Sequence, residues 1–214
     1  MLVSDLMTRD PVVVTDKTPI DDALSLMRDK KVRRLPVLNA KGELVGIVAE
    51  KDILYASPSP ATSLSIHEIH YLLAKLTVAE IMTKNVFTIA EDTPLEEAAR
   101  VMADNRIGAL PVMSDKKLVG IITETDIFKG FVELLGTREP GVRLTMKMPE
   151  GQGVLPLCMD SISKLGGRLL ALVTWGEQDP GIRLVTAKVT GVDTEQLKES
   201  MAKLDVEVVD VRVA

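Results

Sequence analysis

Apolar residues follow the same pattern in two separate parts of the chain. Two segments share the i, i+3, i+4, i+7 spacing that predicts a helix with one buried face. Their apolar positions are Ile20, Ala23, Leu24 and Met27 in one and Leu95, Ala98, Ala99 and Met102 in the other. Thr18-Pro19 and Thr93-Pro94 precede these helices and predict a capping hydroxyl followed by a first-turn proline, with Glu96 completing a capping box in the second segment.

Short runs rich in β-branched residues surround each helix and predict strands. They are residues 12–15, 35–38 and 44–49 in the first part, and residues 86–89, 110–113 and 118–123 in the second. A further helix is expected to begin at Glu50 and at Glu124. The pattern therefore predicts two β-α-β-β-α units.

These two units are copies of one another. Met7-Thr8 recurs as Met82-Thr83, and at the same spacing Leu35-Pro36 recurs as Leu110-Pro111. The second copy is one residue shorter in the turn between its last two strands, where length changes are tolerated. Each copy leaves one apolar sheet face uncovered, so we expect the two copies to pack against each other.

The rest of the chain lacks this motif. Residues 142–148, 168–175, 182–189 and 206–213 read as strands, and residues 154–165 and 193–204 as helices. The order β-α-β-β-α-β is typical of a ferredoxin-like unit, so the fold class is mixed α/β (α+β) throughout. We predict repeats at residues 1–56 and 78–136, a connecting loop and helix at 57–77, and a C-terminal domain at 141–214.

The amino-acid composition and the net charge exclude some classes of function. Hydrophobic residues make up 46% and charged residues 27% of the 214 residues, which excludes disorder as the main description. Aromatic residues make up only 3%, and the net charge is −5. Binding nucleic acid requires an excess of cations or a set of stacking aromatics, so we expect no nucleic-acid partner.

The cysteine content and the lack of targeting segments indicate the cellular location of the protein. The single cysteine, Cys158, excludes an intramolecular disulfide and a multi-cysteine zinc site, and it fits a reducing compartment. No secretion signal is visible, because the acidic residues Asp5 and Asp10 interrupt the first ten residues, where a signal peptide would be basic and then apolar. No segment is apolar enough to span a bilayer. We expect a cytoplasmic protein without a membrane partner.

Three motifs occur in both copies: an MT-x-x-x-h-x-h start, an h-P-V strand and a G-h-h-x-x-x-D end, where h is apolar. On these motifs, about the first 135 residues resemble a tandem pair of cystathionine-β-synthase (CBS) domains. Residues 141–214 resemble an ACT domain, a regulatory unit known for binding amino acids, on the order of their elements. The whole arrangement is similar to acetoin-utilization AcuB-type proteins.

The resemblance implies an adenosyl nucleotide as a regulatory ligand and no required cofactor. Gly120-Ile-Ile-Thr123-Glu-Thr-Asp126 matches the pattern in which a hydroxyl and an aspartate hold a ribose. A carboxylate can accept hydrogen bonds from both cis hydroxyls of a ribose, and such charge-assisted bonds are strong. The alternative is that Asp126 only caps a helix. Arg33 and Arg34, which precede the h-P-V strand, would contact phosphate by bidentate bonding.

In CBS pairs each cleft is built by both repeats. Carried over, Thr8 and Val13 would join Thr123 and Asp126 in one cleft. Asp52, Thr83 and Thr88 would form a second, weaker cleft, since Ala49 stands where the hydroxyl is expected. Because Gly108 and Ala109 occupy the places of the two arginines, we expect the positive charge to serve one cleft alone.

Weaker features admit simpler interpretations. Lys30 and Lys31 suit a cleft or a solvated helix end equally. His67 and His70 could begin a metal site, but the sequence offers no third ligand, so no metal is expected. Gly151, Gly153 and Val154 match the loop that holds ligands in ACT domains, although a structural turn is favoured and Pro156 is expected to delay the helix.

The sequence contains no catalytic constellation, so we expect no enzyme. The first hypothesis is a regulatory sensor that binds AMP, ADP, ATP or S-adenosylmethionine, with the ACT domain sensing an amino acid. The alternative is a dimeric interaction module that regulates a partner enzyme without nucleotide. An enzyme of acetoin metabolism is a third hypothesis that rests on the family name. The resemblance also implies a homodimer.

Overall fold

The computed structural model describes residues 1–56, 75–149, 153–175, 181–204 and 206–214. Residues 57–74 of the predicted connecting loop and helix, which include His67 and His70, lie outside the described residues. The chain divides into two compact units, Met1–Phe128 and Lys129–Ala214, and each is considered by itself. Among the described residues, no helix combines the length and apolar character needed to cross a bilayer.

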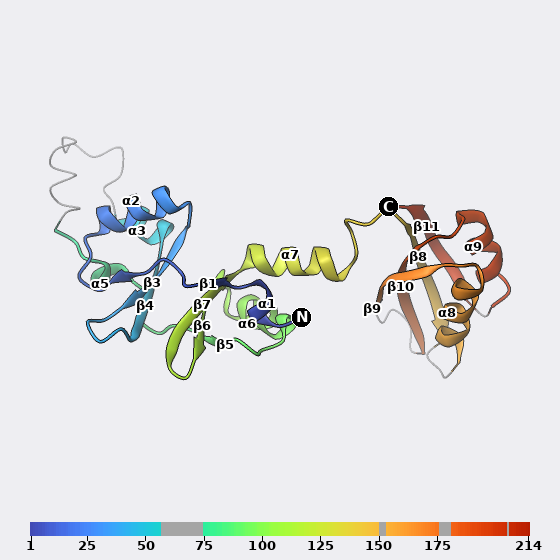
Figure 1. Ribbon diagram of the computed structural model, residues 1–214, viewed down its shortest axis with the longest axis horizontal. Helices are drawn as coiled ribbons and strands as arrows, with labels where there is room; N and C mark the ends of the chain where they lie inside the picture. Colours follow the sequence, from blue (N-terminus) through green and yellow to red (C-terminus); the bar gives the residue numbers. More distant parts are fainter. Residues whose placement is uncertain (57–74, 150–152, 176–180, 205) are drawn as a thin grey trace. The chain divides into compact units, whose positions relative to one another are not determined.

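Both repeats of the first unit contain the predicted elements (Figure 1). The first repeat comprises α1 (Val3–Leu6), β1 (Thr8–Arg9), β2 (Val14–Thr15), α2 (Ile20–Lys30), β3 (Arg34–Leu38), β4 (Leu44–Ala49) and α3 (Glu50–Ala56). The second comprises α5 (Val78–Ile81), β5 (Ile89–Ala90), α6 (Leu95–Asn105), β6 (Ala109–Ser114), β7 (Lys117–Thr123) and α7 (Glu124–Leu134), and α7 continues past Phe128, where the first unit ends. Ile20, Leu24 and Met27 of α2 are buried, as the helical periodicity predicts.

The two repeats exchange their first elements. Val3 and Met7, from the start of the chain, are buried in the core of the second repeat with Leu95 and Leu110. The Val3 amide donates to the carbonyl of Thr93 at 2.9 Å. Each core is thus completed by a short helix that belongs, in sequence, to the other copy.

The second half of this exchange mirrors the first. Val78 of α5 is buried in the core of the first repeat with Ile20 and Leu35. Its amide donates to the carbonyl of Thr18 at 2.8 Å. In Figure 1, α5 lies beside the first repeat and α1 beside α6.

The sheets of the two repeats also include backbone segments from the other repeat. One sheet has the order β1-β7-β6-β5, in which Thr8 of β1 pairs antiparallel with Ile121 of β7. The other has the order β2-β3-β4. Thr83 extends it as an isolated bridge, exchanging backbone hydrogen bonds of 2.9 and 3.0 Å with Ile47 of β4. Each Met-Thr motif therefore lies next to the strand that ends in the other repeat's Thr/Ala-x-x-Asp motif.

Glycine allows this close approach. A Cβ added to Gly120 would lie 2.5 Å from the Met7 sulfur and 3.1 Å from the Thr8 carbonyl oxygen. Gly46 is in the equivalent position against the sulfur of Met82 and the Thr83 carbonyl oxygen. The Met-Thr and glycine motifs are thus contacting parts of one repeated interface.

Helix capping differs from the prediction. Pro19 and Pro94 themselves occupy the N-cap positions of α2 and α6. The Thr18 hydroxyl turns back instead, forming a 3.0 Å hydrogen bond with the hydroxyl of Thr15 and accepting one from its amide at 3.1 Å. The predicted threonine caps and the Glu96 capping box are therefore wrong. A capping box occurs instead at Thr77 and Glu80.

The second unit is a four-stranded antiparallel sheet with two helices on one face (Figure 1). Its elements are β8 (Val142–Pro149), α8 (Val154–Lys164), β9 (Arg168–Trp175), β10 (Ile182–Thr190), α9 (Thr194–Met201) and β11 (Glu207–Val213). The strand order is β11-β8-β10-β9, with every neighbouring pair antiparallel. The predicted ferredoxin-like order is confirmed.

Alternation along the strands separates the two faces of this sheet. Leu144 and Met146 of β8, together with Val185 and Ala187 of β10, join Cys158 of α8 in the buried core. The intervening residues of β8 and β10 point to the face without helices. Helix α8 begins at Val154 with Pro156 in its first turn, so proline does not delay the helix as expected.

Candidate functional site

The first candidate site is a cleft of about 290 Å³ in the first unit, named here the Asp126 cleft. Both repeats line it, through Thr8, Asp10, Pro11, Val12, Lys31, Val32, Arg33, Arg34, Ile121, Thr123, Thr125 and Asp126. Five of the six residues predicted for one site therefore lie together. The sixth, Val13, is exposed at 37%, and its neighbour Val12 takes the place in the lining.

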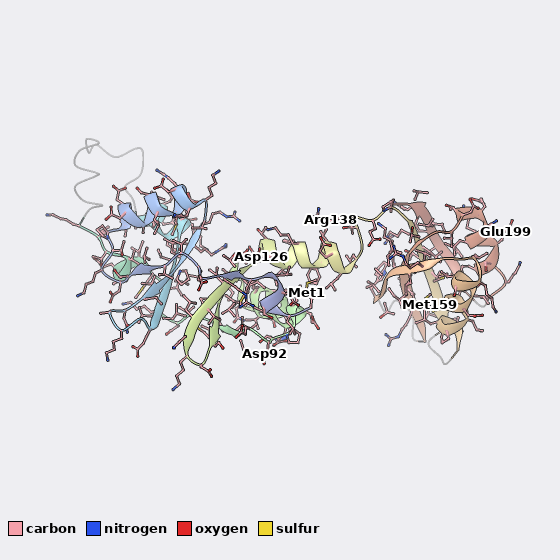
Figure 2. The ribbon with its side chains drawn as sticks, in the orientation of Figure 1. Met1, Asp92, Asp126, Arg138, Met159 and Glu199 are labelled. Atoms are coloured by element: carbon pink, nitrogen blue, oxygen red, sulfur yellow. The ribbon has the colours of Figure 1, made fainter. Side chains whose placement is uncertain are left out.

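Strand pairing explains why residues so distant in sequence meet here. Thr8 lies opposite Ile121, and Thr123 follows two residues later on the same face of β7. The chain then turns into α7, which places Asp126 in its first turn (Figure 2). The short strand β1 thus brings its hydroxyl beside the end of β7.

The carboxylate of Asp126 has a local role at the start of α7. Its Oδ2 accepts hydrogen bonds from the Thr123 amide at 3.0 Å and from the Thr123 hydroxyl at 2.7 Å. In the first repeat, Oδ2 of Asp52 accepts from the Ala49 amide at 2.9 Å. Both aspartates therefore cap a helix, as the structural alternative predicted. A carboxylate has about four lone-pair sites, so a cap does not exhaust its acceptor capacity.

Positive charge gathers on one side of the Asp126 cleft. Lys31 ends α2 in a left-handed conformation, with φ of 55°, and the chain turns sharply there. Arg33 lies just before β3 and Arg34 is the first residue of that strand, so three cationic side chains line the cleft. Asp10 and Asp126 are the acidic residues in the same lining. An anionic ligand would meet an excess of positive charge on this wall.

A second cleft of about 200 Å³ is centred on the equivalent aspartate and is named here the Asp52 cleft. Its lining consists of Arg34, Ile47, Ala49, Lys51, Asp52, Thr83, Asn85, Val86, Phe87, Arg106, Ile107, Gly108 and Ala109. The structure thus brings Asp52 and Thr83 together. Thr88 lines a separate, more open depression with Glu43, Lys84 and Lys116.

Positive charge is shared between the clefts, contrary to the expectation that one cleft alone would hold it. Arg34 lines both, and Lys51 and Arg106 add cations to the Asp52 cleft. Arg106 ends α6 with φ of 53°, as Lys31 ends α2. Arg106 was not among the predicted site residues, although the repeat register places it at the position of Lys31.

The remaining predicted positions do not form a further site. Gly153 is the N-cap of α8 with φ of 111°, and Val154 is the first helical residue, while Gly151 lies outside the described residues. His67 and His70 also lie outside them. Within the described ranges, no group of three His, Cys, Asp or Glu side chains is arranged to hold a metal ion.

The comparison with known families agrees with the duplicated fold and the paired clefts. The family model described as CBS domain matches residues 3–59 and residues 78–133. The chain belongs to the CBS-domain family. The two matched segments correspond to the two repeats, and the second match ends at residue 133.

Solved structures of CBS proteins resemble this chain over most of its length. An acetoin utilization protein (AcuB) from Vibrio cholerae is 32% identical, with a TM-score of 0.53, and the match covers 64% of this chain and 95% of that one. The CBS pair of protein MJ0100, solved with 5′-methylthioadenosine and S-adenosyl-L-methionine, is 30% identical, with a TM-score of 0.52 and coverage of 65% and 98%. CBSX2, solved with AMP, is 32% identical, with a TM-score of 0.53 and coverage of 62% and 97%.

Proposed function

We propose that the CBS pair is a regulatory sensor that holds an adenosyl nucleotide in the Asp126 cleft. The observation that carries this proposal is the convergence of Thr8, Arg33, Arg34, Thr123 and Asp126 on one cleft built from both repeats. Two of the similar solved structures support the ligand class, since CBSX2 was solved with AMP and the CBS pair of MJ0100 with two adenosyl compounds.

The chemistry of the lining suits such a ligand. The carboxylate of Asp126 accepts hydrogen bonds from ribose hydroxyls while the Thr123 hydroxyl orients it. Lys31, Arg33 and Arg34 offer cations to the phosphate or to another charged tail. The apolar walls formed by Val12 and Ile121 accept the flat face of the base.

The Asp52 cleft is proposed as a second, weaker nucleotide site. It contains Asp52 and Thr83, together with cations from Arg34, Lys51 and Arg106. Ala49 leaves the aspartate without a neighbouring hydroxyl. Because Arg34 lines both clefts, a ligand that draws its guanidinium into one cleft weakens binding in the other.

Regulation requires the nucleotide to prefer one arrangement of the two repeats over another. The exchanged elements provide such a device, because α1 and α5 each belong to one repeat in sequence and to the other in packing. A ligand that contacts both repeats in the Asp126 cleft stabilises one relative position of them. The chain is therefore proposed to report nucleotide levels without catalysing a reaction.

The proposal also covers the role of the C-terminal unit, the regulated enzyme and the oligomeric state. The C-terminal unit has the element order of ACT domains, so it is proposed to sense an amino acid or to relay the nucleotide signal. The likeness to AcuB suggests a regulated enzyme in acetoin metabolism, with a homodimer in the cytoplasm as the working form. Sedimentation of the full chain with and without nucleotide tests the dimer.

Calorimetric titration with AMP, ADP, ATP and S-adenosylmethionine tests the central claim. Asp126→Asn keeps an oxygen for the helix cap but removes the charge, and Asp52→Asn makes the same change in the other repeat. We expect Asp126→Asn to weaken the tighter site about tenfold. Asp52→Asn should leave that site nearly unchanged.

The alternative, an interaction module without nucleotide, makes the opposite prediction. If no nucleotide binds at millimolar concentration and Asp126→Asn matches the parent, the sensor is rejected. A stable dimer and a partner enzyme whose binding ignores nucleotide would then favour the interaction module.

A further inference from the structure

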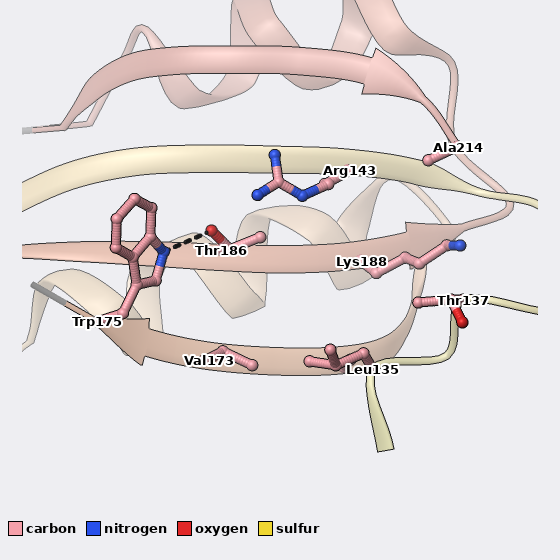
Figure 3. A pocket seen from close by; sticks show the side chains of 9 residues that line it. Leu135, Thr137, Arg143, Val173, Trp175, Thr186, Lys188 and Ala214 are labelled. Carbon is pink, nitrogen blue, oxygen red and sulfur yellow. Dashed lines mark hydrogen bonds between the residues drawn. The ribbon is translucent and has the colours of Figure 1, made fainter. Parts of the chain in front are cut away.

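The C-terminal unit contains a pocket of about 360 Å³ on the sheet face opposite its helices, named here the sheet-face pocket (Figure 3). It is lined by Leu135, Thr137, Arg143, Ala171, Val173, Trp175, Thr186, Lys188 and Ala214. Thr186 and Lys188 alternate on β10 with Val185, Ala187 and Val189, which face the buried core. The pocket therefore lies on the open side of the sheet.

Lys188 is the most unusual residue of this pocket. Only 7% of the residue is exposed, and its Cε lies 3.6 Å from where a side chain on Gly141 would begin. Among the residues that the structure describes, its ammonium group makes no hydrogen bond or ion pair. The ammonium group keeps some exposure to solvent, because every fully buried side-chain nitrogen or oxygen among the described residues has a hydrogen-bond partner. The pocket provides the space in which an external partner would lie.

Arg143 supplies a second cation from the neighbouring strand (Figure 3). Its Nη1 donates to Oδ2 of Asp210 at 3.1 Å, but the same carboxylate also binds the guanidinium of Arg212, whose Nη2 lies 2.6 Å from Oδ1. One acid is thus shared by two arginines. Asp210 therefore leaves the positive charge of this region only partly balanced.

The remaining charges on the open face are also unequal. Lys147 and Glu207 lie opposite each other on β8 and β11, with Nζ and Oε1 3.6 Å apart. Together with Arg143, Lys188 and Arg212, four cations face two acids among the described residues of β8, β10 and β11 on this side. A second copy placed on this face would bring like charges together, so the charge favours a small anion as the occupant.

The other end of the pocket is flat and apolar. Trp175 is half exposed, and its Nε1 donates to the Thr186 hydroxyl at 3.0 Å. The Thr186 hydroxyl forms another 3.0 Å hydrogen bond with that of Thr145, so the ring is held over the sheet. Ala171 and Val173 extend this apolar wall along β9. Such a wall is suited to a planar or apolar group.

We propose that the sheet-face pocket binds a small organic anion, with its carboxylate or phosphate between Lys188 and Arg143 and its flat apolar part against Trp175. This site differs from the loop before α8, because Arg143 lies near the start of β8 and that loop follows the end of the same strand. It is also independent of the nucleotide clefts, since all of its lining residues lie in the C-terminal unit.

Trp175 reports directly on this pocket, because the chain contains a single tryptophan. The full-length protein is titrated with benzoate, with phenyl phosphate and with the neutral analogue benzamide, while Trp175 emission and the heat of binding are followed. We expect a saturable change for at least one anion and none for benzamide. The two anion arms distinguish a carboxylate site from a phosphate site.

Lys188→Met and Lys147→Met provide a matched pair of variants. Both replace a lysine on the same sheet face, but Lys147 lies outside the pocket and is paired with Glu207. We expect Lys188→Met to weaken anion binding about tenfold and Lys147→Met to leave it unchanged.

Several results would overturn this proposal. They are the absence of saturable binding of either anion, equal binding of benzamide, and equal binding by Lys188→Met. Trp175 emission that depends on protein concentration, and is unaffected by anions, would show instead that a second copy covers the face. Arg143→Gln provides a second variant, for which the same loss of anion binding is expected.

Discussion

The guanidinium of Arg34, from the first repeat, lies against the backbone of Gly108 in the second. A Cβ on Gly108 would overlap Nη2 of Arg34 and lie 2.9 Å from its Cζ. Gly108 stands at the repeat position that Arg33 occupies in the first copy. The missing side chain lets Arg34 cross the repeat boundary, and this is why one arginine lines both clefts.

Gly108→Ala is expected to displace Arg34 and the carboxylate of Glu124 without unfolding the unit, because both groups that must move are the ends of flexible side chains. Nucleotide affinity should fall about tenfold in the cleft whose bound nucleotide contacts Arg34. Calorimetry on the parent, Gly108→Ala, Arg34→Ala and the double variant measures this effect. If the glycine acts through Arg34, the second substitution should add little to the first. Strictly additive losses would contradict this account.

Gly120→Ala is expected to destabilise the first unit by about 1–3 kcal/mol. The added methyl group would press on the Met7 sulfur and the Thr8 carbonyl oxygen where the repeats meet. Urea unfolding followed by circular dichroism measures the change. Shortening the opposing side chain in Gly120→Ala/Met7→Ala should make the combined cost smaller than the sum of the single costs. A neutral Gly120→Ala would show that the contact is loose.

Cys158 is expected to be unreactive in the native protein. The residue is fully buried in the C-terminal core, and burial raises the pKa of its thiol, so little thiolate is present at neutral pH. Ellman's reagent should detect almost no thiol in the folded chain and one per chain in guanidinium. Rapid modification of one thiol per native chain would contradict the buried placement.

Asp210 should make the C-terminal unit sensitive to acid. The hydrogen bond from Arg212, followed by smaller effects that include Arg143, lowers the pKa of Asp210. Because the folded pKa is the lower one, the stabilisation is present above the unfolded value of about 3.9 and is lost as pH falls through the folded value.

Urea midpoints of the parent and Asp210→Asn, followed by Trp175 emission, test this between roughly pH 5 and pH 2. The parent should lose stability with falling pH more steeply than Asp210→Asn. Parallel curves for the two proteins would show that the ion pairs with Arg143 and Arg212 do not contribute to folding.

Local sequence patterns predict those features that depend on short-range periodicity. The spacing of Ile20, Ala23, Leu24 and Met27 places one face of α2 in the core, and their burial agrees. Such patterns are less successful at helix ends, where Pro19 rather than Thr18 is the cap, because a threonine side chain has several local partners of similar energy.

Most of the predicted residues of the candidate site lie in the expected clefts, but the distribution of charge between the clefts could not be predicted. Thr8, Thr123 and Asp126 were expected together and lie together. The sharing of Arg34 between clefts was not foreseen, because it depends on the space left by Gly108, a residue distant in sequence.

The sequence by itself determined the duplication, the type and order of most elements and the residues at the ends of the repeated strands, because these follow from short-range periodicity and from the repeat. Only the tertiary structure decided that α1 and α5 exchange between cores, that one arginine serves two clefts and that Lys188 is buried beside Arg143. These features depend on packing between distant segments, and side-chain burial and charge balance there are properties of the folded surface rather than of any local run of residues.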